Sequence, residues 1–142
     1  EGNAAIVARH LRWTPARIAA RLTELAELTR FPRDALARFP HELSGGQAQR
    51  VSLMRALFLE PEVLLLDEPL GALDPITRAD LQADLRAIFG ELGKTVLLVT
   101  HRTSLLSLVE RVIVIDNGRV VADGPRERIM HALQSGRIAK AA

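Results

Sequence analysis

The sequence predicts an α/β fold with a mainly parallel sheet, and three observations support this prediction. Short apolar runs at 63–66 and 96–100 alternate with segments that have the apolar spacing of helices. A short aliphatic run that ends abruptly in charge is typical of a strand buried on both faces, and such strands occur in parallel sheets. Alternating strands and helices indicate α/β architecture. A further strand at 112–115 precedes Asn117-Gly118, a strong two-residue hairpin signal, so we also expect a C-terminal β-hairpin.

The first 58 residues are predicted to form helices. Thr14 is a favoured N-cap and Pro15 is preset for a first helical turn, so a helix is expected to about residue 28. A short helix at 34–38 follows, and then a helix that begins at Ser44 and runs to about 59. We interpret Trp13 as a core residue of this region rather than an interface anchor. The arginines that recur through it are interpreted as a solvated face.

The remaining elements follow in order from the first strand. A helix is predicted from 75 to about 92, because Asp74 and Pro75 suit its start, apolar residues recur at intervals of three and four, and Gly93 suits its C-terminal cap. A short helix at 104–109 precedes the hairpin. We expect Asp123-Gly124-Pro125 to break the return strand, a helix to follow through Leu133, and the tail from 134 to be frayed.

Composition excludes several classes of protein. The 142 residues fit one domain by length, and 48% hydrophobic residues exclude a disordered tail. Nineteen basic residues against seventeen acidic ones leave a net charge of +2, which is too balanced to indicate nucleic-acid binding. No apolar run approaches the roughly 20 residues of a membrane helix. The absence of cysteine excludes disulfides and thiolate metal sites, and a cytosolic setting fits all of this.

A glycine pair after a serine marks the first candidate site. Ser44, Gly45 and Gly46 precede apolar positions spaced as on a helix. Glycines let backbone N–H groups approach a bound group, and a helix start suits an anion because its N–H groups are unpaired and its dipole end is positive. Taken alone, Ser-Gly-Gly favours an ordinary serine-capped helix.

Acidic residues and a histidine follow the two predicted parallel strands. Asp67 and Glu68 come directly after the first strand, and His101 comes after the second. In open α/β sheets, ligands bind at the carboxyl ends of the strands. Taken singly, the acids would indicate a solvated turn, the histidine a structural residue, and Asp74 an N-cap.

The order of these motifs resembles that of the ATP-binding-cassette (ABC) ATPases, over about residues 14–124. Leu-Ser-Gly-Gly-Gln at 43–47 resembles the family signature, and Leu-Leu-Leu-Asp-Glu-Pro at 64–69 resembles its Walker B motif. The resemblance implies the P-loop NTPase fold, with ATP and Mg²⁺ as cofactors. It implies that Asp67 holds Mg²⁺, a hard cation that takes oxygen ligands, and that Glu68 polarises the attacking water.

The resemblance also assigns other residues to the nucleotide site. It implies that Ser44 to Gln47 contact ATP, that His101 is the switch histidine at the γ-phosphate, and that Asp74 belongs to the D-loop, which crosses to a partner subunit. Arg102 departs from the pattern, because many members have an acid there. This departure alters the charge expected around His101.

A P-loop is absent from the 142 residues. Gly90-Glu91-Leu92-Gly93-Lys94-Thr95 looks similar, but Ile88 stands where the first glycine should be, and the segment leads into a strand instead of following one. The family's glutamine loop is also missing. We therefore expect the C-terminal portion of an ABC ATPase domain, with a helical subdomain at 1–58 and part of the ATPase core at 59–142. Little or no ATP hydrolysis is expected from it alone, and the cut sheet is expected to favour self-association.

Segments at 70–78 most resemble the ATPase subunits of importers for osmoprotectants such as glycine betaine, choline or proline betaine. The resemblance implies transmembrane permease subunits, a second ATPase subunit packed head to tail, and a position on the inner face of the cell membrane. Alternatives are an importer ATPase for amino acids or metal chelates, a soluble ABC ATPase without a transport role, and a regulatory module that binds partners without hydrolysis.

Overall fold

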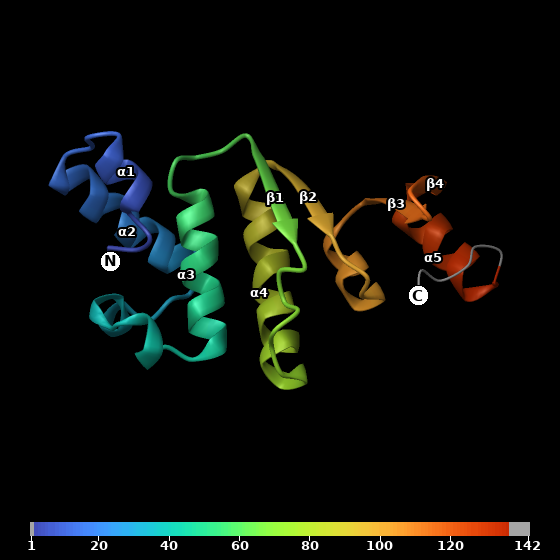
Figure 1. Cartoon of the computed structure of the whole chain (residues 1–142), viewed down its shortest axis with the longest axis horizontal. Coiled ribbons are helices and arrows are strands. Elements are labelled where there is room, and N and C mark those ends of the chain that lie inside the picture. Colours follow the sequence, from blue (N-terminus) through green and yellow to red (C-terminus); the bar gives the residue numbers. More distant parts are fainter. Residues whose placement is uncertain (1, 137–142) are drawn as a thin grey trace.

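The computed structural model describes residues 2–136, which form three successive groups of elements (Figure 1). Helices lie at one end, a strand–helix–strand unit lies in the middle, and a hairpin with a helix lies at the other end. Among the described residues, no helix is both long and apolar enough to cross a membrane. In order, the helices and strands are α1 (Ile6–His10), α2 (Pro15–Leu28), α3 (Gly45–Leu57), β1 (Val63–Asp67), α4 (Pro75–Leu92), β2 (Thr95–Val99), β3 (Arg111–Asp116), β4 (Arg119–Pro125) and α5 (Arg126–Gln134).

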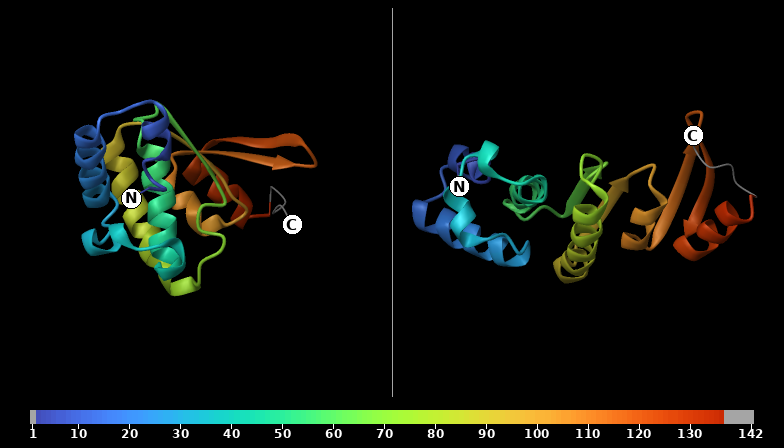
Figure 2. Two further views of the ribbon diagram at one scale, coloured as in Figure 1. Left: turned by 60° about the vertical axis from the view of Figure 1, so that its left-hand side comes forward. Right: turned by 90° about the horizontal axis from the view of Figure 1, so that it is seen from below.

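Strands β1 and β2 pair in parallel, in register from Val63 opposite Thr95 to Asp67 opposite Val99. The prediction of a parallel pair is confirmed, but the prediction that the strand at 63–66 is buried on both faces is wrong. Leu64 is buried against the core, whereas Leu65 is 64% exposed. The reason is that α4 lies along one side of this two-stranded sheet, while the other side is open (Figure 2).

The core lies where α2, α3 and α4 pack together with the inner side of β1. Phe58 follows α3 and packs on Trp13, with 5.9 Å between the ring centroids, so the half-buried Trp13 packs against the core rather than standing free as an anchor. Arg21 on α2 donates hydrogen bonds to the backbone oxygens of Leu57 and Phe58 at the end of α3. The largest fully buried side chains are Phe58, Leu25, Met54, Leu57, Leu70, Leu105 and Thr29.

The ends of the long helices follow their sequence signals. Asp74 accepts hydrogen bonds from the backbone N–H groups of Ile76 and Thr77 and so caps α4. Gly93 ends α4 in the left-handed conformation, with φ of 56°, which glycine adopts without strain. Because Gly90 lies inside α4 and Lys94 leads into β2, the Gly-Lys-Thr segment is not a P-loop.

Shorter helices differ from the predictions. The segments expected as helices at 34–38 and 104–109 are 3-10 helices, Arg33–Ala37 and Thr103–Leu108, and a further 3-10 turn, Pro40–Glu42, leads to Ser44. Phe39-Pro40 limits the first of these, since the residue before proline disfavours the α conformation. Helix α1 lies before Thr14, where no individual helix was predicted.

The hairpin extends further than predicted. Asn117 and Gly118 both have positive φ, as a two-residue hairpin turn requires. Strand β4 nevertheless continues through Asp123 to Pro125, opposite Arg111, so the expected break at 123–125 is wrong. Arg111 and Asp123 form a bidentate ion pair across the strands. Proline is tolerated at the end of β4 because β4 is an edge strand of a two-stranded sheet. The frayed tail expected from 134 lies mostly outside the described residues.

Candidate nucleotide site

The turn at residues 44–47, here called the signature turn, begins α3 with a reciprocal capping box. Ser44 Oγ accepts from the Gln47 backbone N–H at 3.2 Å, and Gln47 Oε1 accepts from the Ser44 backbone N–H at 3.0 Å. The Ser44 hydroxyl hydrogen and the Gln47 amide NH₂ remain able to donate. The predicted cap is confirmed, and the turn presents donors suited to an anion.

The two glycines of the turn also permit close packing against α4. A Cβ on Gly46 would lie 3.0 Å from the Thr77 side chain and 3.2 Å from Leu81, and one on Gly45 would lie 3.2 Å from Leu73. The glycines therefore have a packing reason as well as the expected phosphate-binding one. As a result, the signature turn lies against the residues that begin α4.

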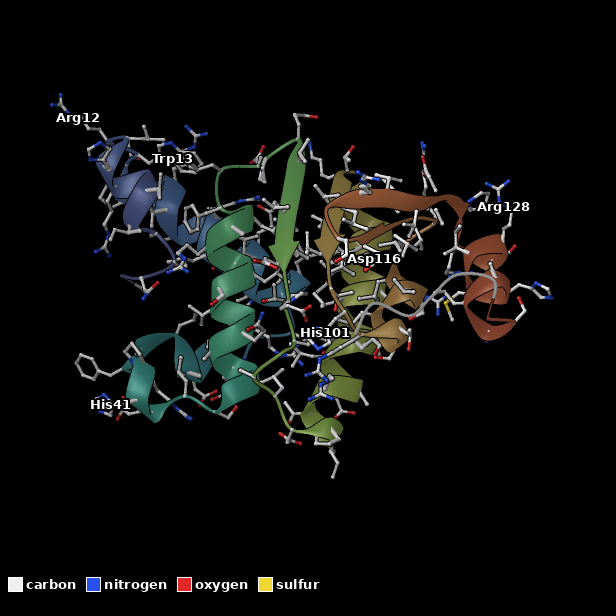
Figure 3. The ribbon with its side chains drawn as sticks, turned by 45° about the vertical axis from the view of Figure 1, so that its right-hand side comes forward. Arg12, Trp13, His41, His101, Asp116 and Arg128 are labelled. Carbon is white, nitrogen blue, oxygen red and sulfur yellow. The ribbon has the colours of Figure 1, made fainter. Side chains whose placement is uncertain are left out.

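The second group of site residues surrounds Glu68 at the carboxyl ends of β1 and β2. Oε1 of Glu68 lies 2.7 Å from both the backbone N and the Nδ1 of His101, and Oε2 accepts from the Thr100 hydroxyl at 3.2 Å. His101 extends beyond the ends of the two strands (Figure 3). Because an ionised carboxylate only accepts, Nδ1 carries the hydrogen in this contact.

The backbone conformation of Glu68 and its ionised state are both consistent with these hydrogen bonds. Glu68 has φ of 42°, a conformation that a non-glycine residue rarely adopts, and its N–H donates to the Val99 oxygen at 2.9 Å. Burial raises the pKa of Glu68, but hydrogen bonds from the His101 backbone and side chain and from Thr100 outweigh it, so the pKa lies below the ordinary 4.5. Glu68 is therefore ionised at neutral pH.

Asp67 ends β1 with an exposed carboxylate beside Glu68. Its oxygens are of the kind that Mg²⁺ prefers. The described part of the chain holds no cluster of three or more His, Asp or Glu side chains that could bind a metal. The residues present therefore fit a Mg²⁺ that keeps water and phosphate oxygens as its other ligands, rather than one held by protein groups alone.

The segment from Glu68 to Asp74, here called the acidic loop, connects the two groups. The Gly71 N–H donates to the backbone oxygen of Glu68 at 3.0 Å, and Asp74 caps α4 beside the signature turn. The pKa of Asp74 is lowered, chiefly by the Thr77 side-chain and backbone hydrogen bonds. Arg78 holds the loop from α4 by donating to the backbone oxygens of Leu70 and Leu73.

Of the sequence-predicted residues, the structure joins Glu68 and His101 directly by hydrogen bonds, and it joins Ser44 to Gln47 through the capping box. Asp67 precedes Glu68 at the end of β1 and lines the cavity between α3, α4 and β1, and Asp74 belongs to the acidic loop. Sequence reasoning missed Thr100 and Arg78; the position of Thr100 directly before His101 was the available signal. Arg102 Nε is buried and finds no hydrogen-bond partner among the described residues.

Comparison with known proteins gives one consistent family. Residues 3–71 match the family described as ABC transporter. The chain is 46% identical over 123 residues to the glycine betaine uptake system ATP-binding protein YehX of Escherichia coli (strain K12). This match covers 86% of the chain and 40% of YehX. It is 48% identical over 110 residues to the sulfate/thiosulfate import ATP-binding protein CysA of Xanthomonas campestris pv. campestris, covering 77% and 32%.

A solved structure of a protein from the same family has a similar fold. The chain superimposes on the dimeric structure of MJ0796, a bacterial ABC transporter cassette, with a TM-score of 0.67 and 32% identity over 80% of this chain and 49% of that one. The chain thus spans less than half the length of the relatives it matches. Motif order, fold and these similarities agree: the chain belongs to the ABC transporter family, within its ATP-binding domain.

Proposed function

We propose that this chain supplies the signature turn and the catalytic carboxylates of an ATP-hydrolysing site in an importer's ATP-binding subunit. The observation that supports it most strongly is the Glu68 carboxylate, held by the backbone and ring of His101 and by Thr100 at the carboxyl end of a parallel strand pair. Phosphoryl transfer is catalysed mainly by positioning and charge neutralisation, with one group orienting the nucleophile. An ionised, rigidly held carboxylate suits that last role.

Each residue has a distinct part in this proposal. Glu68 accepts a hydrogen bond from the attacking water and orients it. His101 keeps the carboxylate fixed through Nδ1, and its ring, when protonated on both nitrogens, donates from Nε2 to a γ-phosphate oxygen. Ser44 and the backbone N–H groups of Gly45 and Gly46 donate to phosphate oxygens. Asp67 would hold Mg²⁺, which when bound neutralises phosphate charge.

The proposal also implies partner subunits, because the chain holds only part of the nucleotide site. The signature turn and the acidic loop lie on one chain, but the 142 residues contain no P-loop. We infer that ATP lies between the signature turn of one subunit and the P-loop of a second subunit packed head to tail; the dimeric MJ0796 cassette supports this. We also propose permease subunits as membrane partners and a position on the inner face of the cell membrane.

For the transported substrate we propose quaternary-amine osmoprotectants. The similarity to a glycine betaine uptake protein covers 86% of the chain and supports this, as do the segments at 70–78. The similarity to a sulfate/thiosulfate import protein favours a second candidate, an importer ATPase of another subfamily. Because an ATPase subunit does not touch the transported molecule, the distinction depends on which permease it activates.

The decisive experiment is a chimera in which these 142 residues replace the matching segment of YehX. We expect the remainder of YehX to supply the P-loop that the 142 residues lack. We expect the chimera to hydrolyse Mg-ATP, measured by phosphate release, whereas the 142-residue chain alone shows little or no turnover because it lacks the P-loop lysine. Turnover by the chain alone that Glu68→Gln abolishes would contradict this expectation. Restored glycine betaine uptake in cells that lack YehX would support the osmoprotectant candidate.

Self-association of the 142-residue chain is a further expected result. The open side of the β1–β2 pair exposes Val63, Leu65, Leu97 and Val99, each at least half exposed, on a sheet with unpaired edges. Such surfaces favour pairing with a second copy. Light scattering should show a mass above that of the monomer, and Leu97→Lys should lower it. Ile76→Lys, at a 78% exposed position on α4, is the matched control. A clean monomer at all concentrations would exclude this association.

A further inference from the structure

Asp84 on α4 is the buried charged residue of the described chain, with 9% of its surface exposed. It lies in the middle of α4. With Arg50 and with Asp67 of the candidate site it lines a cavity of about 200 Å³ between α3, α4 and β1, whose other walls are largely apolar. A carboxylate in such surroundings is unfavourable unless charged partners compensate its lost hydration.

Two arginines from different elements provide that compensation. Arg50 on α3 donates through Nη2 to Oδ2 of Asp84, and Arg30, just after α2, donates through Nη1 to Oδ1 at 2.7 Å. Arg50 also donates through Nη1 to the backbone oxygen of Thr29. One carboxylate therefore joins the end of α2 and the middle of α3 to α4.

The two arginines are not equivalent. The side chain of Arg50 is 17% exposed, whereas that of Arg30 is 67% exposed. An ion pair in water is weak because both charges stay hydrated, while a buried pair that loses one member leaves an uncompensated charge. The contact between Arg50 and Asp84 is therefore the constraining one, and Arg30 adds a solvated second contact.

The position of this pair constrains the candidate site. Asp84 lies ten residues after Asp74, about 15 Å along the axis of α4, and Arg50 lies six residues after Ser44, about 9 Å along α3. At the other end, Gly46 touches Thr77 and Leu81. Two separated contacts between a pair of helices fix both their spacing and their crossing angle, whereas one contact would leave a pivot.

We propose that Asp84 is a positioning residue. Through Arg50 it fixes the angle between α3 and α4, and so it sets where the signature turn lies relative to the acidic loop. The catalytic part of this inference rests on the proposed function, in which the signature turn of this chain contacts one ATP of the head-to-tail pair and its acidic loop lies at the other, so the angle between α3 and α4 must fit both sites. Displacement of reacting groups by about 1 Å can cost about a hundredfold in rate.

The first test uses the 142-residue chain itself. Since it contains no cysteine, cysteines at exposed Ala48 on α3 and exposed Ala87 on α4 can carry two spin labels. Double electron–electron resonance should give a narrow distribution of label-to-label distances for the parent chain and a broadened or shifted distribution for Asp84→Asn. Both proteins are labelled and frozen from solutions well below their unfolding temperatures. Arg33→Gln, which removes an exposed ion pair with Glu27, is the matched control and should leave the distribution unchanged.

The second test uses the chimera. Asp84→Asn should lower kcat about tenfold or more while KM for Mg-ATP changes less than about threefold, and Asp84→Glu should restore most of the rate. An unchanged distance distribution in folded Asp84→Asn overturns the positioning role, as does an unchanged kcat in an active chimera. If the parent chimera hydrolyses no ATP, the proposed function fails, and the distance measurement alone decides the role of Asp84.

Discussion

Replacing Glu68 by glutamine in the chimera is expected to lower the rate of ATP hydrolysis by about 10²- to 10⁴-fold, the range typical of a lost general base. The carboxylate is ionised because hydrogen bonds from His101 and Thr100 hold its pKa below the ordinary value. Glutamine has nearly the same shape and still accepts from the His101 N–H, but it carries no negative charge to polarise water. Phosphate release under saturating Mg-ATP measures the effect.

The matched control is Glu62→Gln, one residue before β1. Glu62 is exposed and pairs with Lys94 at 3.2 Å, so the substitution removes an equal charge outside the site. Its turnover should stay within about twofold of the parent chimera, since exposed ion pairs contribute little. Both variants should unfold at nearly the same temperature. Glu68→Gln turnover within threefold of the parent would show that Glu68 does not orient the attacking water.

Replacing Phe58 by alanine is expected to destabilise the helical region by about 3–5 kcal/mol, a large share of the roughly 5–15 kcal/mol of a whole domain. Phe58 is 1% exposed, packs on Trp13, and has its backbone oxygen bound by Arg21. Truncation leaves a cavity between α2 and the end of α3. Because Trp13 is the single tryptophan, its fluorescence during urea unfolding reports this region directly.

Phe39→Ala is the control for this measurement. Phe39 is 66% exposed and stacks on His41, so its truncation should change stability by no more than about 0.5 kcal/mol. Equal urea midpoints for the two variants would mean that Phe58 does not join α2 to α3 as the structure indicates. A large loss of stability in Phe58→Ala alone would establish that the packing of α3 depends on this contact.

Much of the local structure followed from the sequence because its causes are local. Ser44 and Asp74 cap α3 and α4 as their side-chain chemistry predicts, and Gly93 ends α4 where a left-handed residue is needed. Asn117-Gly118 forms the hairpin turn. Each of these effects depends on residues within about four positions, which a sequence displays directly.

Burial of the strands was predicted less well. Leu65 and Val63 belong to a continuous aliphatic run, yet both are exposed. The composition of a run shows that its side chains favour burial, but it does not show whether a layer covers both faces. The extent of β4 was misjudged for a similar reason, since pairing with Arg111 outweighed the turn-like character of 123–125.

By itself the sequence determined the order of the motifs, the helix caps and the family, because these depend on residue type and spacing. Only the tertiary structure decided that Glu68 accepts hydrogen bonds from Thr100 and His101, and that Arg78 donates to the backbone of the acidic loop. It also decided that Asp84 joins three helical segments through its arginine partners. These contacts join residues from 5 to 54 positions apart in the chain. Most of them depend on how strands and helices stack, and no local preference specifies which distant side chains then meet.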